Sequence, residues 1–338
     1  MGIALAHSRH RRLVGSGQIH EQIAEIVERQ TTGHLKLHGE SCGAIVVPAL
    51  YTTPHPWRHE VAYSRTKTFL MANPSRSMTT LLGQTMRSLA FLSRVSVPQR
   101  YFIDGATMRD DSAAFAFAGA LIGVIPAVLL LFLSAIGVPQ TMVAIFAVLT
   151  AIAVTGALHE DGLADVADGF FGGATKERRL EIMKDSRIGA YGAIALAGSI
   201  LLRVSAVAAI LQAEGAGAAA FALIAVAACS RAALVWFWAS MPNARPGGVA
   251  DMAGAPAENA VGMAAMSGLA IFAVLATASV GFVNAAIALL LAIMGLQAFS
   301  RLSTRMIGGH TGDTLGACQQ VVEIMLLTGL ALGISIPT

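Results

Sequence analysis

Long uncharged stretches alternate with short polar ones over most of the chain. Residues 112–158 contain no Asp, Glu, Lys or Arg. As one helix rising 1.5 Å per residue, this stretch would measure about 70 Å, twice the roughly 30 Å hydrocarbon core of a bilayer. It therefore predicts two membrane-spanning helices, with residues 137–140 (GVPQ) as the turn between them.

Three later apolar stretches extend this pattern. Residues 260–300 are also uncharged and break near 281–284, and residues 188–242 fold back at 214–217. A last run, residues 321–337, is long enough for one more span. The pattern predicts an all-α integral membrane protein with about seven transmembrane helices, arranged as three hairpins plus a final span.

The N-terminal part of the chain follows a different pattern. Residues 1–85 hold most of the histidines and show little sustained periodicity, which predicts an atypical extension that is disordered or not native. Residues 86–338 form the predicted polytopic catalytic domain. Residues 81–97 carry apolar side chains at helical spacing, which predicts an N-terminal surface helix on the membrane. An aqueous stretch that includes Asp111 is predicted to follow it.

The composition agrees with a membrane protein. The chain is 55% hydrophobic and only 13% charged, too apolar for an ordinary soluble enzyme. The formal net charge of +3 is small, and we expect no nucleic-acid partner. Cys42, Cys229 and Cys318 are far apart and predict neither a disulfide framework nor a zinc site. We expect membrane lipid as a partner, and the sequence leaves a homo-oligomer open.

The predicted hairpins place the polar segments on one side of the membrane. Each hairpin returns the chain to the side it left, so residues 159–173, 243–248 and 308–314 share one face. That face carries most of the Lys and Arg, whereas the opposite turns carry none. The positive-inside rule then predicts a multi-pass protein of the bacterial cell inner membrane whose active site faces the cytoplasm.

The most acidic of these segments is residues 159–173 (HEDGLADVADGFFGG). In a helix, Asp161, Asp165 and Asp168 at positions i, i+4 and i+7 project from one face. Like charges repel there unless a cation lies between them, and Mg²⁺ prefers carboxylate oxygens, water and substrate phosphate. We predict these three aspartates to be catalytic metal ligands. Solvated helix caps are the alternative, which explains one or two acids but not three on one face.

Two neighbours of these aspartates are interpreted differently. Glu160 points away from the aspartate face in a regular helix, so we expect it to have a supporting or structural role. His159 is predicted to orient a carboxylate or substrate in catalysis. A simple interfacial histidine explains it equally well.

A second charged segment, residues 180–192 (LEIMKDSRIGAYG), lies where the chain re-enters the membrane. We predict Asp185 as a further catalytic metal ligand and Lys184 and Arg187 as substrate-binding clamps on phosphate. The alternative is positive-inside anchoring, which does not explain an aspartate between two cations.

The third segment, residues 308–316 (GGHTGDTLG), is rich in glycine and threonine. Backbone N–H groups and hydroxyls in such a loop can cradle phosphate. We therefore predict that Thr311, Gly312 and Thr314 bind substrate around a catalytic Asp313. An ordinary turn is the alternative.

Three arginines are further candidates for the site. Arg203 and Arg231 lie inside hydrophobic spans, where a charge is costly and usually faces the bundle interior or snorkels. We predict that Arg231 reaches a substrate phosphate, while Arg203 stays ambiguous. Arg245 lies in a Pro-Gly loop, where it binds substrate or anchors the interface.

Several of these segments together resemble the cobalamin synthase (adenosylcobinamide-GDP ribazoletransferase) family. The matching motifs run from residue 86 to the C-terminus in the order of the family, whose members usually begin near Met86. They are RSLAFLSRVSVPQR (87–100), HEDGLADVADGFFGG (159–173), LEIMKDSRIGAYG (180–192), CSRAAL (229–234) and GGHTGDTLGA (308–317).

The resemblance implies an inner-membrane enzyme that completes the nucleotide loop of vitamin B12. It would transfer the phosphoryl-cobinamide of adenosylcobinamide-GDP to α-ribazole or α-ribazole 5′-phosphate, releasing GMP, with Mg²⁺ as cofactor. Asp161, Asp165 and Asp168 would hold the metal against the pyrophosphate. The general base would be an aspartate of the cluster, Asp313 or His159.

Two other functions fit parts of the sequence. The D-x-x-D-G of residues 165–169 resembles part of the CDP-alcohol phosphotransferase signature, but the rest of that signature does not continue. A secondary transporter would explain the two deep arginines. Transporters, however, place ionisable groups near the bilayer midplane, whereas the acids here gather at one face.

Overall fold

The computed structural model describes residues 81–102 and 106–332, all of them within the compact unit Pro56–Thr338. The predicted extension 1–85 therefore lies outside the described residues except for its last few positions. Within the described part the secondary structure is helical, with one isolated β-bridge between Asn243 and His310. The helices are α3 (Leu81–Leu92), η1 (Gln99–Tyr101), α4 (Met108–Asp111), η2 (Ser112–Ala114), α5 (Phe115–Ala135), α6 (Gln140–Thr155), α7 (Leu158–Gly172), α8 (Lys176–Ile182), α9 (Ala190–Ala239), α10 (Val249–Ala253), α11 (Glu258–Ile307) and α12 (Gly312–Ala331).

The first predicted hairpin consists of α5 and α6. The chain turns between them at Gly137, whose φ of 81° lies in the left-handed region that favours glycine. The turn falls within the predicted residues 137–140. The two helices pack against each other, as an antiparallel pair joined by a short turn does.

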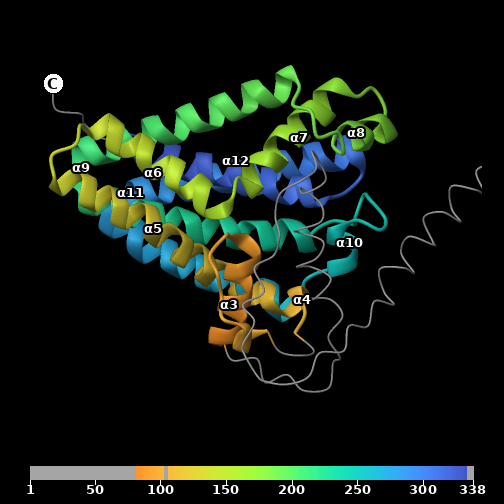
Figure 1. The fold of residues 1–338 in the computed structure, drawn as a ribbon, viewed down its shortest axis with the longest axis horizontal. Coiled ribbons are helices and arrows are strands. Elements are labelled where there is room, and N and C mark those ends of the chain that lie inside the picture. The colour runs from red at the N-terminus through yellow and green to blue at the C-terminus, as the bar shows by residue number, and fades with distance from the viewer. Residues whose placement is uncertain (1–80, 103–105, 333–338) are drawn as a thin grey trace, which may run out of the picture. The chain divides into compact units, whose positions relative to one another are not determined.

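The long helices α9 and α11 each contain a break. Each has 50 residues and would be about 75 Å long if straight. Gly215 and Gly281 leave helical geometry with φ of 85° and 84°, at the positions where the sequence predicts a fold-back. Both helices reverse direction there (Figure 1). The Ser279 hydroxyl donates to the Ala218 carbonyl at 2.7 Å, so the two reversals lie at the same end of the bundle.

The last helix, α12, packs between α9 and α11. Small residues allow close contact with the second half of α11, where Gly329 lies against Ala288 and Gly295 against Met325. Close approach through Gly and Ala is typical of helices that associate in membranes.

Several helices are long and apolar enough to cross a membrane. Among the described residues, four pass by length and composition: Met108–Ala135, Ala190–Ala239, Glu258–Ile307 and Gly312–Ala331. The pair α6 and α7, bent by 89° between them, is a fifth candidate if taken as one span. Large apolar side chains such as Met266 and Phe282 are about three-quarters exposed, at 75% and 74%. The all-α, multi-pass membrane architecture predicted from the sequence is thereby confirmed.

Helix α3 is fixed to the end of α4 by a buried ion pair. The Arg87 Nε and Nη2 atoms donate to the Asp111 carboxylate at 2.8 and 2.6 Å, and its Nη1 donates to the Tyr101 carbonyl at 3.0 Å. Both charged side chains are almost fully buried. The prediction of an aqueous stretch was wrong at Asp111, because Arg87 satisfies its charge inside the protein.

The sharp bend between α6 and α7 directs the acidic segment. Gly156 and Ala157 both have left-handed backbones, with φ of 64° and 57°. This conformation is strained for alanine. A Cβ atom on Gly156 would collide with Arg94, whose backbone N–H donates to the Val154 carbonyl at 2.7 Å. The segment after α3 therefore packs into the bend from which α7 starts.

Candidate functional site

The acidic motif forms helix α7, as predicted. Asp161, Asp165 and Asp168 are partly buried on this helix. The side of α7 that carries Gly162 lies directly on the backbone of Asp313, where a Cβ atom on Gly162 would collide with the carbonyl oxygen. The acidic helix thus lies against the N-terminal end of α12, next to the predicted phosphate loop.

Asp168 holds the start of α9. Its Oδ2 accepts the backbone N–H of Gly189 at 2.7 Å and its Oδ1 accepts that of Gly192 at 2.9 Å. A Cβ atom on either glycine would collide with the carboxylate. The unpaired N–H groups and the macrodipole of a helix N-terminus both favour an anion at this place. Asp168 therefore has a structural function in addition to any contact with a metal.

The second charged segment contains an ion pair at the surface. The Arg187 Nη2 lies 2.7 Å from the Asp185 Oδ2, and its Nε lies 3.1 Å from the Oδ1. These hydrogen bonds from Arg187 lower the pKa of Asp185 to about 2. The Arg187 side chain is 87% exposed, and Lys184 is exposed beside it. The structure thus pairs two residues for which the sequence predicts separate roles.

The polar segments at residues 243–248 and 308–314 contact each other. The His310 N–H donates to the Pro242 carbonyl at 2.9 Å, and the Ala244 N–H donates to the His310 carbonyl at 2.8 Å. Arg245 lies between them, with its Nη1 3.1 Å from the Asp313 Oδ2 and its Nη2 donating to the Leu180 carbonyl at 3.3 Å. Arg245 therefore links the loop before α10 to both α8 and the start of α12.

The glycine-threonine loop forms a capping box at the start of α12. The Thr314 Oγ1 accepts the Thr311 N–H at 2.7 Å, and the Thr311 Oγ1 accepts the Thr314 N–H at 3.3 Å. Both hydroxyls thus stabilise the helix end, and Gly312 is its first residue. His310 next to them is buried, which lowers its pKa to about 4.

The described carboxylates do not form a complete metal site by themselves. Among the described residues, no group of three or more His, Cys, Asp or Glu side chains is placed to hold a metal ion. Asp168 is bound to α9 and Asp185 to Arg187. Asp161 and Asp165 lie one turn apart on α7, and Mg²⁺ usually takes one or two carboxylates plus water and substrate phosphate. The carboxylate oxygens of Asp161 and Asp165 are of the type that a magnesium ion would take if substrate completed its coordination.

A buried polar cluster involves Glu160, the neighbour of Asp161, and the sequence predicted it only in part. The Arg203 Nη1 lies 2.9 Å from the Glu160 Oε1 and 3.3 Å from the Glu323 Oε1, and all three side chains are at most 13% exposed. The Gln320 Nε2 donates to Glu160 at 3.1 Å. The Gln319 Nε2 donates to Glu323 and, at 3.1 Å, to the Ser230 hydroxyl. The cluster joins α7, α9 and α12.

This cluster explains the roles of Glu160 and Arg203. Glu160 points inward, as its position off the aspartate face predicts, and Arg203 is its partner. The missed members were Glu323, Gln319 and Gln320. The signal available in the sequence was one acidic and two amide side chains in residues 319–323, within a stretch of otherwise apolar residues.

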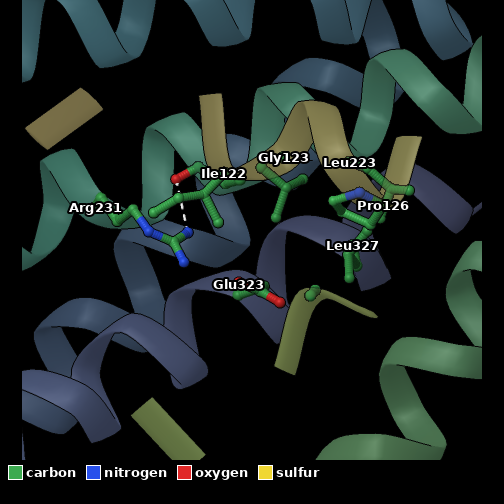
Figure 2. A pocket seen from close by; sticks show the side chains of 10 residues that line it. Ile122, Gly123, Pro126, Leu223, Arg231, Glu323 and Leu327 are labelled. Carbon is green, nitrogen blue, oxygen red and sulfur yellow. Dashed lines mark hydrogen bonds between the residues drawn. The ribbon is translucent and has the colours of Figure 1, made fainter. Parts of the chain in front are cut away.

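Arg231 also points into the bundle. Its Nη1 donates to the Ala227 carbonyl at 3.0 Å, and it lines a cavity of about 30 Å³ with Glu323. Figure 2 shows the Arg231 guanidinium directed toward the side of the cavity where Glu323 lies. A cavity of this size can hold a water molecule. His159 is likewise buried, and its Nε2 makes no hydrogen bond to any described residue.

The fold and this site define a multi-pass membrane protein with a carboxylate- and arginine-rich site at one end of its helices. The family described as Cobalamin-5-phosphate synthase matches residues 84–331, and the chain belongs to that family. This confirms the resemblance noted in the sequence.

Known relatives support the same assignment. The Adenosylcobinamide-GDP ribazoletransferase of Brucella ovis is 45% identical over 256 residues, covering 75% of this chain and 98% of the relative. The protein of the same name from Brucella anthropi is 42% identical over 255 residues, with the same two coverages. No solved structure matches the chain.

Proposed function

We propose that this protein is an adenosylcobinamide-GDP ribazoletransferase acting in the last steps of cobalamin synthesis. It transfers the phosphoryl-cobinamide moiety to α-ribazole or α-ribazole 5′-phosphate, releases GMP and forms adenosylcobalamin or its 5′-phosphate. Family membership over residues 84–331 supports this reaction class. The observation that carries the proposal is the contact of α7, the helix that carries the aspartates, with the backbone of Asp313, whose carboxylate pairs with Arg245.

The reaction is a phosphoryl transfer. A ribose hydroxyl of the ribazole attacks the phosphorus nearest the cobinamide and forms a new P–O bond. The bond from that phosphorus to the bridging oxygen breaks, and GMP leaves with the oxygen. Catalysis of such a step depends mainly on positioning and on stabilising the charge that develops on the phosphates.

We assign the cofactor Mg²⁺ to Asp161 and Asp165, which lie one turn apart on α7. When bound, the metal supplies charge neutralisation at the diphosphate. The oxygen-only donor set on α7 supports this choice over a softer metal.

The cationic residues of the site bind the phosphate groups in this proposal. Arg245 holds Asp313 at 3.1 Å and can exchange that contact for a phosphate oxygen. Arg187 can do the same with Asp185, because the pair lies at the surface. The proton of the attacking hydroxyl goes to an aspartate of the site or to His159. His159 is the candidate whose Nε2 makes no hydrogen bond to described residues.

We also propose seven membrane crossings, formed by α5, α6, the two halves of α9, the two halves of α11, and α12. The reversals at Gly215 and Gly281 support counting each half separately. We propose α3 as a helix on the membrane surface, supported by the exposed Leu81 and Leu82 at its start. The site end, which is rich in Lys and Arg, faces the cytoplasm of the bacterial cell.

Purified protein in detergent tests the reaction directly. We expect GMP to form when adenosylcobinamide-GDP and either ribazole acceptor are both present, in equal amounts with the cobalamin product. Chromatography of the nucleotide and corrinoid fractions measures both. GMP formation at the same rate without the acceptor, or no GMP formation by folded protein, would contradict the proposal. CMP release from a CDP-alcohol in the same assay would point to phospholipid headgroup transfer instead.

A further inference from the structure

A second cationic region lies where α9 and α11 end. It is a groove of about 450 Å³, and none of its residues belongs to the site described above. We refer to it as the basic groove. It is lined by Trp236, Ser240, Met241, Ser300, Arg301, Thr304 and Arg305.

The positive charge of the basic groove is not compensated within the described part of the protein. Arg301 and Arg305 are exposed, and the structure gives neither of them a hydrogen bond or an ion pair with a described residue. They lie one turn apart on α11 and so project from the same face. Among the described residues, no acidic side chain lines the groove. Two unpaired guanidinium groups side by side favour an anion with several oxygens, such as a phosphate.

The hydroxyl groups of the basic groove are not free to donate to an anion. Ser240, Ser300 and Thr304 donate to carbonyls of their own helices, at 3.0, 2.7 and 2.9 Å. Their protons are thereby engaged. The anion-binding donors of the groove are therefore the two guanidinium groups.

The arginines extend an apolar face of α11. Leu290 and Met294 are 58% and 59% exposed, and Ala298 is exposed after them. Residues 290, 294, 298, 301 and 305 are three or four positions apart. These five residues therefore lie on one side of the helix. The surface thus presents apolar side chains first and two cations at the helix end, which matches the acyl chains and phosphate of a phospholipid.

Simple stabilisation of the helix end does not explain both arginines. A cation in the last turn of α11 offsets the partial negative charge there, and Arg305 has that position. Arg301 lies a turn further in and faces the groove beside Trp236. Tryptophan is enriched where the apolar core of a membrane meets its headgroups.

We propose that the basic groove binds the phosphate of an anionic phospholipid whose acyl chains lie along the exposed apolar face of α11. Basic pockets between transmembrane helices are known to select anionic headgroups over zwitterionic ones. Binding here would be stoichiometric and would not involve the aspartate site. The proposal does not depend on the transferase reaction.

Native mass spectrometry of the whole detergent-purified protein tests this inference. The protein is titrated with phosphatidylglycerol and, separately, with phosphatidylcholine. We expect one phosphatidylglycerol to be retained at a concentration at least about tenfold lower than phosphatidylcholine requires. The double variant Arg301→Gln/Arg305→Gln should lose this preference. The matched control, Arg109→Gln/Arg178→Gln, removes two exposed arginines elsewhere and should keep it.

Three outcomes would overturn the proposal. One is equal retention of the two lipids by the wild-type protein, and another is undiminished phosphatidylglycerol binding by the double variant. The third is displacement of the lipid by millimolar inorganic phosphate, which would identify a soluble anion as the ligand. If the double variant does not fold, each single variant should still weaken binding, and unchanged binding in both would contradict the assignment.

Discussion

Some charged residues in this protein have buried partners and others have exposed partners. This difference determines how much each ion pair contributes to the stability of the protein. Arg203 holds the carboxylates of Glu160 and Glu323 inside the helix bundle. Arg178 and Glu181 form a comparable contact of 2.7 Å, but on the surface, where both side chains are more than half exposed. Removing one partner of a buried pair leaves an uncompensated charge, whereas water replaces a surface partner.

We therefore predict that Arg203→Met lowers the free energy of unfolding by about 3–5 kcal/mol. Arg178→Met, the matched surface substitution, should change it by less than about 1 kcal/mol. Reversible unfolding of the purified protein in mixed micelles measures both. Equal losses in the two variants would show that Arg203 is not the partner of a buried charge pair.

His310 is expected to make stability depend on pH. Burial lowers its pKa in the folded protein to about 4, partly offset by Asp251, while the unfolded value is near 6.5. Above about pH 6.5 both states are neutral and stability is complete. As the pH falls toward 4, the unfolded state binds the proton first, which removes about 3 kcal/mol.

The measurement for His310 is thermal unfolding between pH 7.5 and 4 for the wild type and His310→Gln. The variant should show a smaller loss of stability over this interval, because glutamine does not titrate. Identical pH dependence in both proteins would contradict a buried, neutral His310.

At the scale of elements, the start of α9 depends on α7. The carboxylate of Asp168 accepts the N–H groups of Gly189 and Gly192, and both glycines lack room for a Cβ atom. The acidic helix and the next long helix are thus joined through one side chain. A substitution at either glycine should therefore displace the Asp168 carboxylate.

We predict that Gly192→Ala destabilises the protein and lowers turnover by displacing the Asp168 carboxylate. Gly198→Ala is the matched control, because it lies in the same helix with nothing within 4 Å of its Cβ position. It should be neutral or stabilise by about 0.5–1 kcal/mol. Melting temperature and turnover of both variants give the comparison. Equal behaviour of the two would argue against the close contact at Gly192.

The helical elements and their breaks could be predicted from the sequence because they depend on local patterns. A largely apolar stretch of known length with a glycine near its centre is enough to place the reversals at Gly215 and Gly281. The acidic helix α7 also follows from the spacing of its aspartates. The 89° bend before α7 could not be predicted, because the left-handed backbone at Ala157 has no local sequence signal.

The partners of the charged side chains could not be predicted in the same way. Arg203 and Glu323 are far apart in the chain and meet only when α9 packs against α12. Likewise, the sequence assigns Asp168 and Asp185 to one metal site, whereas the structure attaches each to a different partner. Tertiary packing, which the local pattern does not encode, decides these contacts.

For the whole molecule, the order of reversals determines where its ends lie. The seven proposed crossings, an odd number, would place the end of α12 on the membrane side opposite the aspartate site. We predict that a reporter fused to the C-terminus reports a periplasmic location. A reporter inserted in the loop between α8 and α9 should report the cytoplasm. A cytoplasmic C-terminus would mean that one segment does not cross, with the two halves of α11 as the first place to look.

The aspartate site is tested most directly by Mg²⁺-dependent GMP release from adenosylcobinamide-GDP and α-ribazole 5′-phosphate, comparing wild type with Asp165→Asn. Asp110→Asn is the matched control, since Asp110 is exposed on α4 and outside the site. We predict turnover that requires Mg²⁺, a loss of at least about 100-fold in Asp165→Asn, and near-normal turnover in Asp110→Asn. Full turnover by Asp165→Asn, with an unchanged Mg²⁺ requirement, would contradict the account by removing Asp165 from the site.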